Sequence, residues 1–333
     1  MTNHIHIRYI NVWQDESIVC LKEYIKYGFI KMGYHIIEDN RCKFPDVVVT
    51  SVFGNPASLR QFDTKRTFII VFTGENTVGR MVYNPWKYEN IVSNYDIGAY
   101  LGFDRDEGPR KFRVPLWVIH YQLQIENSYG RKLIQSNHVV NDYKPICNRS
   151  TSVTIISSHG RNFREEFYNK CTNSNIVVKC PGKFKHNDSN LKDIEQRVTG
   201  WNKLQDAKVE YLTDYVFNLS CENSNTKGYC TEKLMDCVIA GCIPIYWGDD
   251  DNEKIFNQNR IIKVDTSKPN SLDDAIMTIK RMTDNKEYLN SFFEQPIFTK
   301  DAIVYIDEFV SKIVLVAKLY TEFVNTRNTS TVM

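Results

Sequence analysis

The chain has 333 residues, more than one hydrophobic core usually serves, so we expect two domains. Hydrophobic residues at 42% and charged residues at 25% are typical of globular proteins and exclude collagen-like, low-complexity and wholly disordered chains. The 42 Lys and Arg residues nearly balance 40 Asp and Glu residues, and the resulting charge of +2 argues against nucleic acid as the main partner.

The nine cysteines form no Cys-X-X-Cys pair and show no metal-site spacing with histidine. An odd number of scattered cysteines indicates reduced, mostly buried thiols, as in cytosolic proteins. No window reaches the roughly 18 apolar residues that span a bilayer, and the N-terminus lacks the pattern of a secretion signal. We therefore expect a soluble, cytoplasmic protein without a transmembrane segment, from a microbe or a virus.

Residues 1–118 alternate β-rich runs with helical stretches, a pattern typical of a parallel α/β sheet. Apolar residues at helical spacing predict a helix over 15–30. Runs of β-branched and aromatic residues predict strands over 5–12, 46–50, 67–72 and 91–97. Residues 119–150 are polar and without period, so we expect a linker between domains there.

A second α/β series occupies residues 151–300. Strands are predicted over 152–157, 176–179, 216–220, 242–247 and 261–264, and helices over 162–170, 191–204, 231–239 and 271–282. The C-terminal segment 301–333 begins with a predicted helix over 301–319, whose apolar face packs on the body of the protein or on a partner; we favour the body. Two doubly wound halves are therefore expected, with a polar ligand in the cleft between them.

The most informative segment follows the predicted strand 216–220. Glu222-Asn223-Ser224 leads through a turn at Gly228 to Thr231, a plausible N-cap of the next helix. Lys233 then lies in the first helical turn, where the helix dipole disfavours a cation. A lysine in this position is expected if it binds a phosphate together with the free backbone N–H groups. The alternative is a solvent-exposed lysine paired with an acidic residue.

Three further groups of polar residues have two interpretations each. Glu75 follows the strand 67–72 beside Gly74, so it is either a general base or a loop glutamate without a role. Arg161 and Arg164 lie one helical turn apart and either clamp a pyrophosphate or are solvated. The acidic run 249–251 resembles a metal-binding carboxylate pair, but N-capping of a short helix explains it better.

Together these motifs resemble the α-1,3-fucosyltransferases of glycosyltransferase family 10, and their soluble bacterial members in particular. The resemblance spans residues 67–265. It rests on Glu222-Asn223-Ser224, Gly228-Tyr229 and Thr231-Glu232-Lys233, on the segment 241–248, and on Thr73-Gly74-Glu75-Asn76.

The resemblance implies two Rossmann-like domains facing a cleft, the glycosyltransferase-B arrangement. Residues 1–118 would form the acceptor side and residues 151–300 the GDP-fucose-binding domain. Glu75 would be the general base, and Lys233 and Arg164 would bind the diphosphate without an obligatory metal. The remaining donor-substrate contacts implied are Glu222, Asn223, Tyr229 and Glu232. Stimulation by a divalent metal stays open.

The function implied is inverting transfer of L-fucose from GDP-fucose to a glycan hydroxyl, α-1,3 to GlcNAc of an N-acetyllactosamine-like unit. One alternative is a transferase of the same fold that uses another nucleotide sugar or acceptor. The other is a catalytically silent glycan-binding module. Residues 77–86 depart from the family pattern in the region that faces the acceptor, so the acceptor is the least constrained part of the hypothesis.

Overall fold

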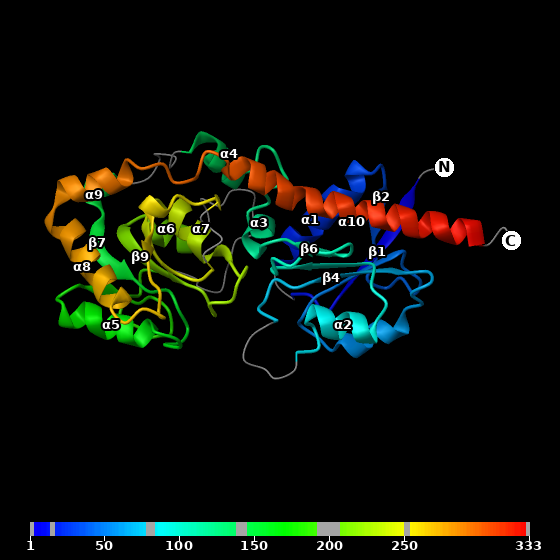
Figure 1. The fold of residues 1–333 in the computed structure, drawn as a ribbon, viewed down its shortest axis with the longest axis horizontal. Coiled ribbons are helices and arrows are strands. Elements are labelled where there is room, and N and C mark those ends of the chain that lie inside the picture. The colour runs from blue at the N-terminus through cyan, green and yellow to red at the C-terminus, as the bar shows by residue number, and fades with distance from the viewer. Residues whose placement is uncertain are drawn as a thin grey trace. The chain divides into compact units, whose positions relative to one another are not determined.

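A computed structural model describes residues 3–13, 17–77, 84–137, 145–191, 207–249 and 254–330. The chain divides into two compact units. The N-terminal unit comprises Met1–Ile125, Thr226–Tyr229 and Ile306–Met333, and the C-terminal unit comprises Glu126–Asn225 and Cys230–Tyr305. Each unit is built on one parallel sheet with helices packed against it (Figure 1).

The sheet of the N-terminal unit has the order β2-β1-β3-β4-β5-β6 and is parallel throughout. Its strands are β1 (His4–Ile10), β2 (His35–Glu38), β3 (Val47–Thr50), β4 (Phe68–Phe72), β5 (Ala99–Gly102) and β6 (Lys111–Arg113). Strands β3 and β4 are buried at every position, which explains their unbroken apolar sequences. The helices include α1 (Ser17–Lys31), η1 (Pro56–Gln61), α2 (Tyr88–Asn94) and α3 (Leu116–His120).

The C-terminal helix α10 (Ala302–Ser330) packs on the N-terminal unit, beside α1 in Figure 1. Ile313, Val316 and Tyr320 are buried in the same core cluster as α1. The Tyr24 hydroxyl of α1 donates a hydrogen bond of 2.8 Å to the carbonyl of Phe309. The preferred placement of this helix on the body of the protein is therefore confirmed, although the helix continues beyond residue 319 to Ser330.

The sheet of the C-terminal unit has the order β11-β10-β9-β7-β8 and is also parallel. Its strands are β7 (Ser150–Thr154), β8 (Val178–Lys179), β9 (Tyr215–Cys221), β10 (Ile243–Trp247) and β11 (Ile262–Lys263). Its helices include α4 (Tyr129–Ser136), η2 (Ile146–Asn148), α5 (Arg164–Asn173), α6 (Ala207–Leu212), α7 (Glu232–Ile239), η5 (Gln258–Arg260), α8 (Ser271–Asp284) and α9 (Lys286–Phe293).

Both sheets share one topology, in which the first strand lies between the second and the third. The direction of winding therefore reverses between β7 and β9 in the C-terminal unit. In sheets of this kind, ligands bind beyond the carboxyl ends of the two strands that flank the reversal. The predicted fold class, α/β with two Rossmann-like halves, is confirmed, and the order of strands indicates where the C-terminal unit would hold a ligand.

Two predictions about local structure were wrong. Residues 91–97 are not a strand: α2 ends at Asn94 and β5 begins at Ala99. A short run with apolar Ile91 and Val92 fits either structure, and here Ile91 is the buried residue of α2. The expected linker 119–150 contains α4, where Ser128 caps the N-terminus and Leu133 and Ile134 are buried. Two adjacent apolar residues are too few to show a helical period.

Other expectations concern the thiols, membrane spans and domain limits. All nine cysteines are free thiols, and seven of them are buried, as expected from their spacing. Within the described ranges, no helix is long and apolar enough to cross a bilayer. The predicted helix 191–204 lies almost entirely outside the described residues. The division into domains at 118, 150 and 300 stays a prediction.

Candidate active site

A charged cluster lies at the carboxyl end of β9 in the C-terminal unit. Glu222 directly follows β9 and is fully buried, and its backbone N–H donates to the Trp247 carbonyl of β10 at 2.9 Å. Gly248, the residue after β10, leaves room for it, because a Cβ atom on Gly248 would lie only 2.7 Å from Glu222 Cγ. The pairing of β9 with β10 and the absence of a side chain at Gly248 thus place the carboxyl group of Glu222 inside the protein.

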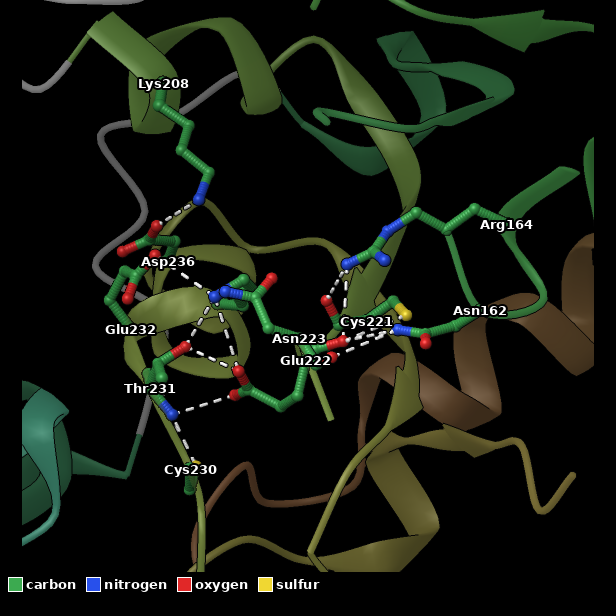
Figure 2. Close-up of polar contacts among 11 residues, drawn as sticks. Asn162, Arg164, Lys208, Cys221, Glu222, Asn223, Cys230, Thr231, Glu232 and Asp236 are labelled. Carbon is green, nitrogen blue, oxygen red and sulfur yellow. Dashed lines mark hydrogen bonds and ion pairs between the residues drawn. The ribbon is translucent and has the colours of Figure 1, made fainter. Parts of the chain in front are cut away.

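The carboxylate of Glu222 binds the start of α7 (Figure 2). Its Oε1 accepts a hydrogen bond from the Thr231 N–H at 2.8 Å, and its Oε2 accepts one from the Thr231 hydroxyl at 2.6 Å. Lys233 Nζ lies 2.7 Å from Thr231 Oγ1 and 3.3 Å from Glu222 Oε2. The three residues form a closed network, which we call the Glu222–Thr231–Lys233 network.

The N-terminus of α7 differs in one respect from the expected cap. Thr231 occupies the N-cap position, but its side chain makes no capping hydrogen bond, because the hydroxyl is directed to Glu222. The Glu222 carboxylate supplies negative charge at this helix end, where it is favourable, and offsets the charge of Lys233. Lys233 is thus paired with an acid, as the alternative interpretation held, but its side chain is only 21% exposed. It also lies 3.6 Å from Glu232, which is itself buried.

Arg164, the first residue of α5, is buried against the same strand end. Its Nη2 donates to the carbonyls of Cys221 at 2.7 Å and Glu222 at 3.3 Å, and its Nη1 donates to the Arg161 carbonyl at 3.1 Å. Figure 2 shows this guanidinium beside the last residues of β9. The side chain of Arg161 is exposed, so the two arginines have different surroundings.

The loop between β7 and α5 is held to β9 by a second side chain as well. Asn162 has a left-handed backbone (φ 63), a conformation that asparagine tolerates better than most residues. Its Nδ2 donates to the carbonyl of Asn223 at 3.3 Å, and the Asn223 side chain is exposed. The two strands that flank the winding reversal are therefore joined by side chains at their carboxyl ends.

Positive charge collects around this loop. Burial, and then the charges of Arg164, Arg161 and Lys233, lower the pKa of His159. Three cations from two segments therefore lie close enough to act on one imidazole, and the two acids Glu222 and Glu232 accompany one of them, Lys233. The first turn of α7 adds the backbone N–H groups and positive dipole end that attract phosphates.

Glu75 lies in the N-terminal unit, at the carboxyl end of β4, as predicted. Thr73 extends the sheet pairing by one residue, with its N–H donating to the Leu101 carbonyl at 2.8 Å. Glu75 follows two residues later and is half-buried. Asn76 Nδ2 donates to Thr226 Oγ1 at 2.8 Å, which fixes the loop that carries Glu75.

The segment Thr226–Tyr229, between β9 and α7 in sequence, packs on the N-terminal unit. Gly228 has φ 88, and a Cβ atom there would collide with the Phe103 carbonyl oxygen, so only glycine fits. Arg113 Nη2 donates to the Gly228 carbonyl at 3.3 Å. The Tyr229 ring is 1% exposed and packs edge-on against Phe103. Tyr229 is therefore a buried side chain of this unit, which sequence alone does not indicate.

The predicted site residues thus fall into two groups. The C-terminal unit brings together Arg164, Glu222, Asn223, Glu232 and Lys233, whereas Glu75 and Tyr229 belong to the N-terminal unit. The sequence did not indicate that Thr231 is a partner of Lys233, or that Gly248 leaves room for the side chain of Glu222. In the acidic run 249–251, Asp249 is buried and the other two residues lie outside the described ranges.

No metal-site spacing is visible in the sequence, yet three potential ligands meet in the described part of the N-terminal unit. Atoms of His6, Asp39 and Cys42 lie within 4.8 Å of one another. They come from β1 and from the connection between β2 and β3, more than 30 residues apart. Spacing in sequence does not reveal a group assembled by a crossover of this kind.

Residues 146–304 match the family model described as glycosyltransferase family 10 (fucosyltransferase) C-terminal domain. The chain is 28% identical over 329 residues to an α-(1,3)-fucosyltransferase of Helicobacter pylori, covering 90% of this chain and 62% of that protein. It is 36% identical over 112 residues to a putative fucosyltransferase of Acanthamoeba polyphaga mimivirus, covering 34% of this chain and 18% of that protein. The chain thus spans less than two thirds of the length of these relatives.

Solved structures support the same fold. A crystal structure of an α1,3-fucosyltransferase superposes with a TM-score of 0.63 at 24% identity, covering 96% of this chain and 92% of the other. A crystal structure of an α1,3-fucosyltransferase with GDP-fucose gives a TM-score of 0.60 at 24% identity, with 94% and 91% covered. The fold of the chain is thus similar to that of solved α1,3-fucosyltransferases, and residues 146–304 match the C-terminal domain of glycosyltransferase family 10.

Proposed function

We propose that the chain is an inverting fucosyltransferase that moves L-fucose from GDP-fucose to a hydroxyl of a glycan acceptor. The acceptor we propose is an N-acetyllactosamine-like unit, fucosylated α-1,3 on GlcNAc. The observation that carries this proposal is the Glu222–Thr231–Lys233 network with Arg164 at the winding reversal of the C-terminal unit. The names of the Helicobacter pylori relative and of the solved structure with GDP-fucose support the choice of sugar and nucleotide.

In this proposal, Lys233, Arg164 and the N-terminus of α7 bind the diphosphate. As the bond to fucose breaks, negative charge grows on the departing β-phosphate, and fixed cations and N–H groups stabilise it. A guanidinium has five N–H groups, and the contacts of Arg164 with three carbonyls use at most three of them. These groups would make a metal ion at the diphosphate dispensable.

Glu75 is the proposed general base. It would remove the proton of the acceptor hydroxyl while that oxygen attacks the anomeric carbon from the face opposite GDP, which inverts the configuration. Residues 1–118 would hold the acceptor and residues 151–300 the sugar nucleotide, with Glu232 and Asn223 contacting nucleotide or fucose. Tyr229 would not contact the ligand, because its ring is buried against Phe103 in the N-terminal unit. We place the enzyme in the cytoplasm because its nine cysteines are free thiols, as in reducing compartments.

Thermal unfolding in EDTA with GDP, GDP-fucose, UDP or buffer tests this proposal. A ligand at about 100 times its dissociation constant stabilises the folded state by roughly 2.7 kcal/mol. We expect the unfolding temperature to rise with GDP and GDP-fucose but not with UDP. A rise with UDP alone would favour another nucleotide sugar, and a rise only after adding metal would contradict a metal-independent site. No rise with any nucleotide would favour a silent glycan-binding module.

A further inference from the structure

Both carboxylate oxygens of Glu222 bind groups inside the protein. We propose that Glu222 is a positioning residue, which acts with Thr231 to hold Lys233, and that it does not contact the sugar nucleotide; this inference rests on the proposed function. Glu222 is fully buried, and Oε1 and Oε2 both accept hydrogen bonds from Thr231. A diphosphate is itself anionic, so a carboxylate is an unfavourable direct contact for it.

Thr231 connects Glu222 to Lys233. A hydroxyl has one hydrogen, and Thr231 donates it to Glu222 Oε2 at 2.6 Å, a length typical of a charge-assisted bond. Its oxygen lone pairs are therefore available to accept from Lys233 Nζ at 2.7 Å. The same ammonium lies 3.3 Å from Glu222 Oε2. These two acceptors are fixed to each other, and together with Glu232, whose Oε1 lies 3.6 Å from Nζ, they hold the ammonium at the first turn of α7.

The room for Glu222 is also built into the sheet. Gly248 follows β10, and a Cβ atom at this position would press on Glu222 Cγ and on the Tyr246 hydroxyl. The backbone N–H of Glu222 is paired with Trp247 of the same strand. The carboxylate is thus fixed by two strands, while Thr231 and Lys233 lie at the start of a helix. Because Glu222 is fixed to the sheet and contacts Lys233, it determines where the lysine ammonium lies relative to the sheet.

This arrangement has two opposite effects on binding of the sugar nucleotide. Holding Lys233 in place beforehand reduces the ordering cost of binding. The negative charge of Glu222, in contrast, weakens the attraction between Lys233 and a phosphate. We therefore expect the two effects largely to cancel in GDP affinity. Turnover depends on where the cation lies when charge develops on the leaving group, so loss of positioning should lower kcat.

The test measures kcat for transfer from GDP-fucose, and the GDP dissociation constant by calorimetry, for wild type, Glu222→Gln, Thr231→Val and Thr231→Ser. For Glu222→Gln and Thr231→Val we expect kcat to fall about ten-fold or more, since small misplacements of catalytic groups are costly. We expect their GDP dissociation constants to stay within about three-fold of wild type. Thr231→Ser keeps the hydroxyl, so it should restore kcat to within about three-fold of wild type.

Thr231→Val is included because Glu222→Gln buries an amide NH₂ among hydrogen-bond donors and lowers stability. Asp188→Asn is the matched control, because it also converts a buried carboxylate of this unit to an amide. Asp188 accepts hydrogen bonds from the hydroxyls of Tyr211 and Tyr215 and from the N–H of Asn190. The Asp188→Asn variant should unfold more readily than wild type with kcat unchanged.

The positioning role is wrong if wild type transfers fucose and both Glu222→Gln and Thr231→Val keep kcat within two-fold. The positioning role is equally wrong if Glu222→Gln and Thr231→Val weaken GDP binding as much as Lys233→Ala does. Such a result would mean that Glu222 and Thr231 contact GDP directly or that the variants misfold. A wild-type chain that neither binds GDP nor uses GDP-fucose contradicts the proposed function and, with it, this inference.

Discussion

Each end of β9 buries a carboxylate, and the two differ in the groups that bind them. At the amino end, Asp188 accepts hydrogen bonds from the hydroxyls of Tyr215 at 3.0 Å and Tyr211 at 3.1 Å. At the carboxyl end, Glu222 accepts from Thr231 and lies against the ammonium of Lys233. Neutral donors satisfy the first carboxylate, whereas a cation at a helix N-terminus balances the second.

The partners of a buried carboxylate thus indicate its role. Burial alone would raise the pKa of Asp188, but hydrogen bonds from the Asn190 N–H and the two tyrosines outweigh it and hold that pKa below its ordinary value. Such a group stabilises the fold, because donors of the protein itself bind both of its oxygens. Glu222 contacts Lys233 at the carboxyl end of the sheet, where sheets of this topology bind ligands. We therefore propose that the carboxylate at one end of β9 serves stability and the carboxylate at the other end serves catalysis.

The largest effect should come from Glu75→Gln, which leaves both ends of β9 intact. Loss of a general base typically lowers the rate about 10²- to 10⁴-fold, so we expect transfer to fall by that factor. The GDP dissociation constant should stay within about three-fold of wild type, since Glu75 belongs to the N-terminal unit. Steady-state kinetics and calorimetry measure the two quantities. A similar loss in both would rule out the general-base role.

Lys233→Ala should act on the carboxyl end of β9 itself. A hydrogen bond to a charged group contributes about 1.5–3 kcal/mol, so the GDP dissociation constant should rise roughly 10- to 100-fold. Calorimetry with GDP gives this value, and Arg164 remains in the variant to bind the diphosphate. Unchanged GDP affinity would refute the phosphate contact and leave Lys233 as a partner of Glu222 only.

Asp188→Asn tests the amino end and should have the smallest effect on catalysis. We expect a loss of about 1–3 kcal/mol in the free energy of unfolding, because the amide NH₂ cannot accept from a tyrosine hydroxyl. Urea denaturation measures the loss, and kcat and GDP affinity should match wild type. Weaker GDP binding in this variant would contradict the proposal that the two ends of β9 have different roles.

The effect of Asp188→Asn on stability should also depend on pH in the acidic range. Because the pKa of folded Asp188 is below its unfolded value, its contribution is complete above the ordinary aspartate range and is lost as the pH falls through the folded pKa. The stability difference between wild type and Asp188→Asn should therefore shrink as the pH is lowered through that window. A difference that stays constant with pH would contradict the low pKa.

The sequence predicted most of the sheets because their central strands are continuous apolar runs, as in β4 and β10, and it placed Glu75 and Thr231 at the correct ends of their elements. It could not show the Glu222–Thr231–Lys233 network. Glu222 and Thr231 are nine residues apart, and the intervening segment Thr226–Tyr229 packs on the other unit. Burial of Tyr229 and the space left by Gly248 likewise depend on strand pairing and long-range packing.

The most direct measurement is incubation of the purified chain with GDP-fucose and N-acetyllactosamine in EDTA, followed by mass spectrometry and NMR of the product. We expect release of GDP and a trisaccharide with fucose linked α-1,3 to GlcNAc. No consumption of GDP-fucose, or its hydrolysis to GDP and free fucose without a fucosylated product, would contradict the assignment of this chain as a fucosyltransferase acting on that acceptor.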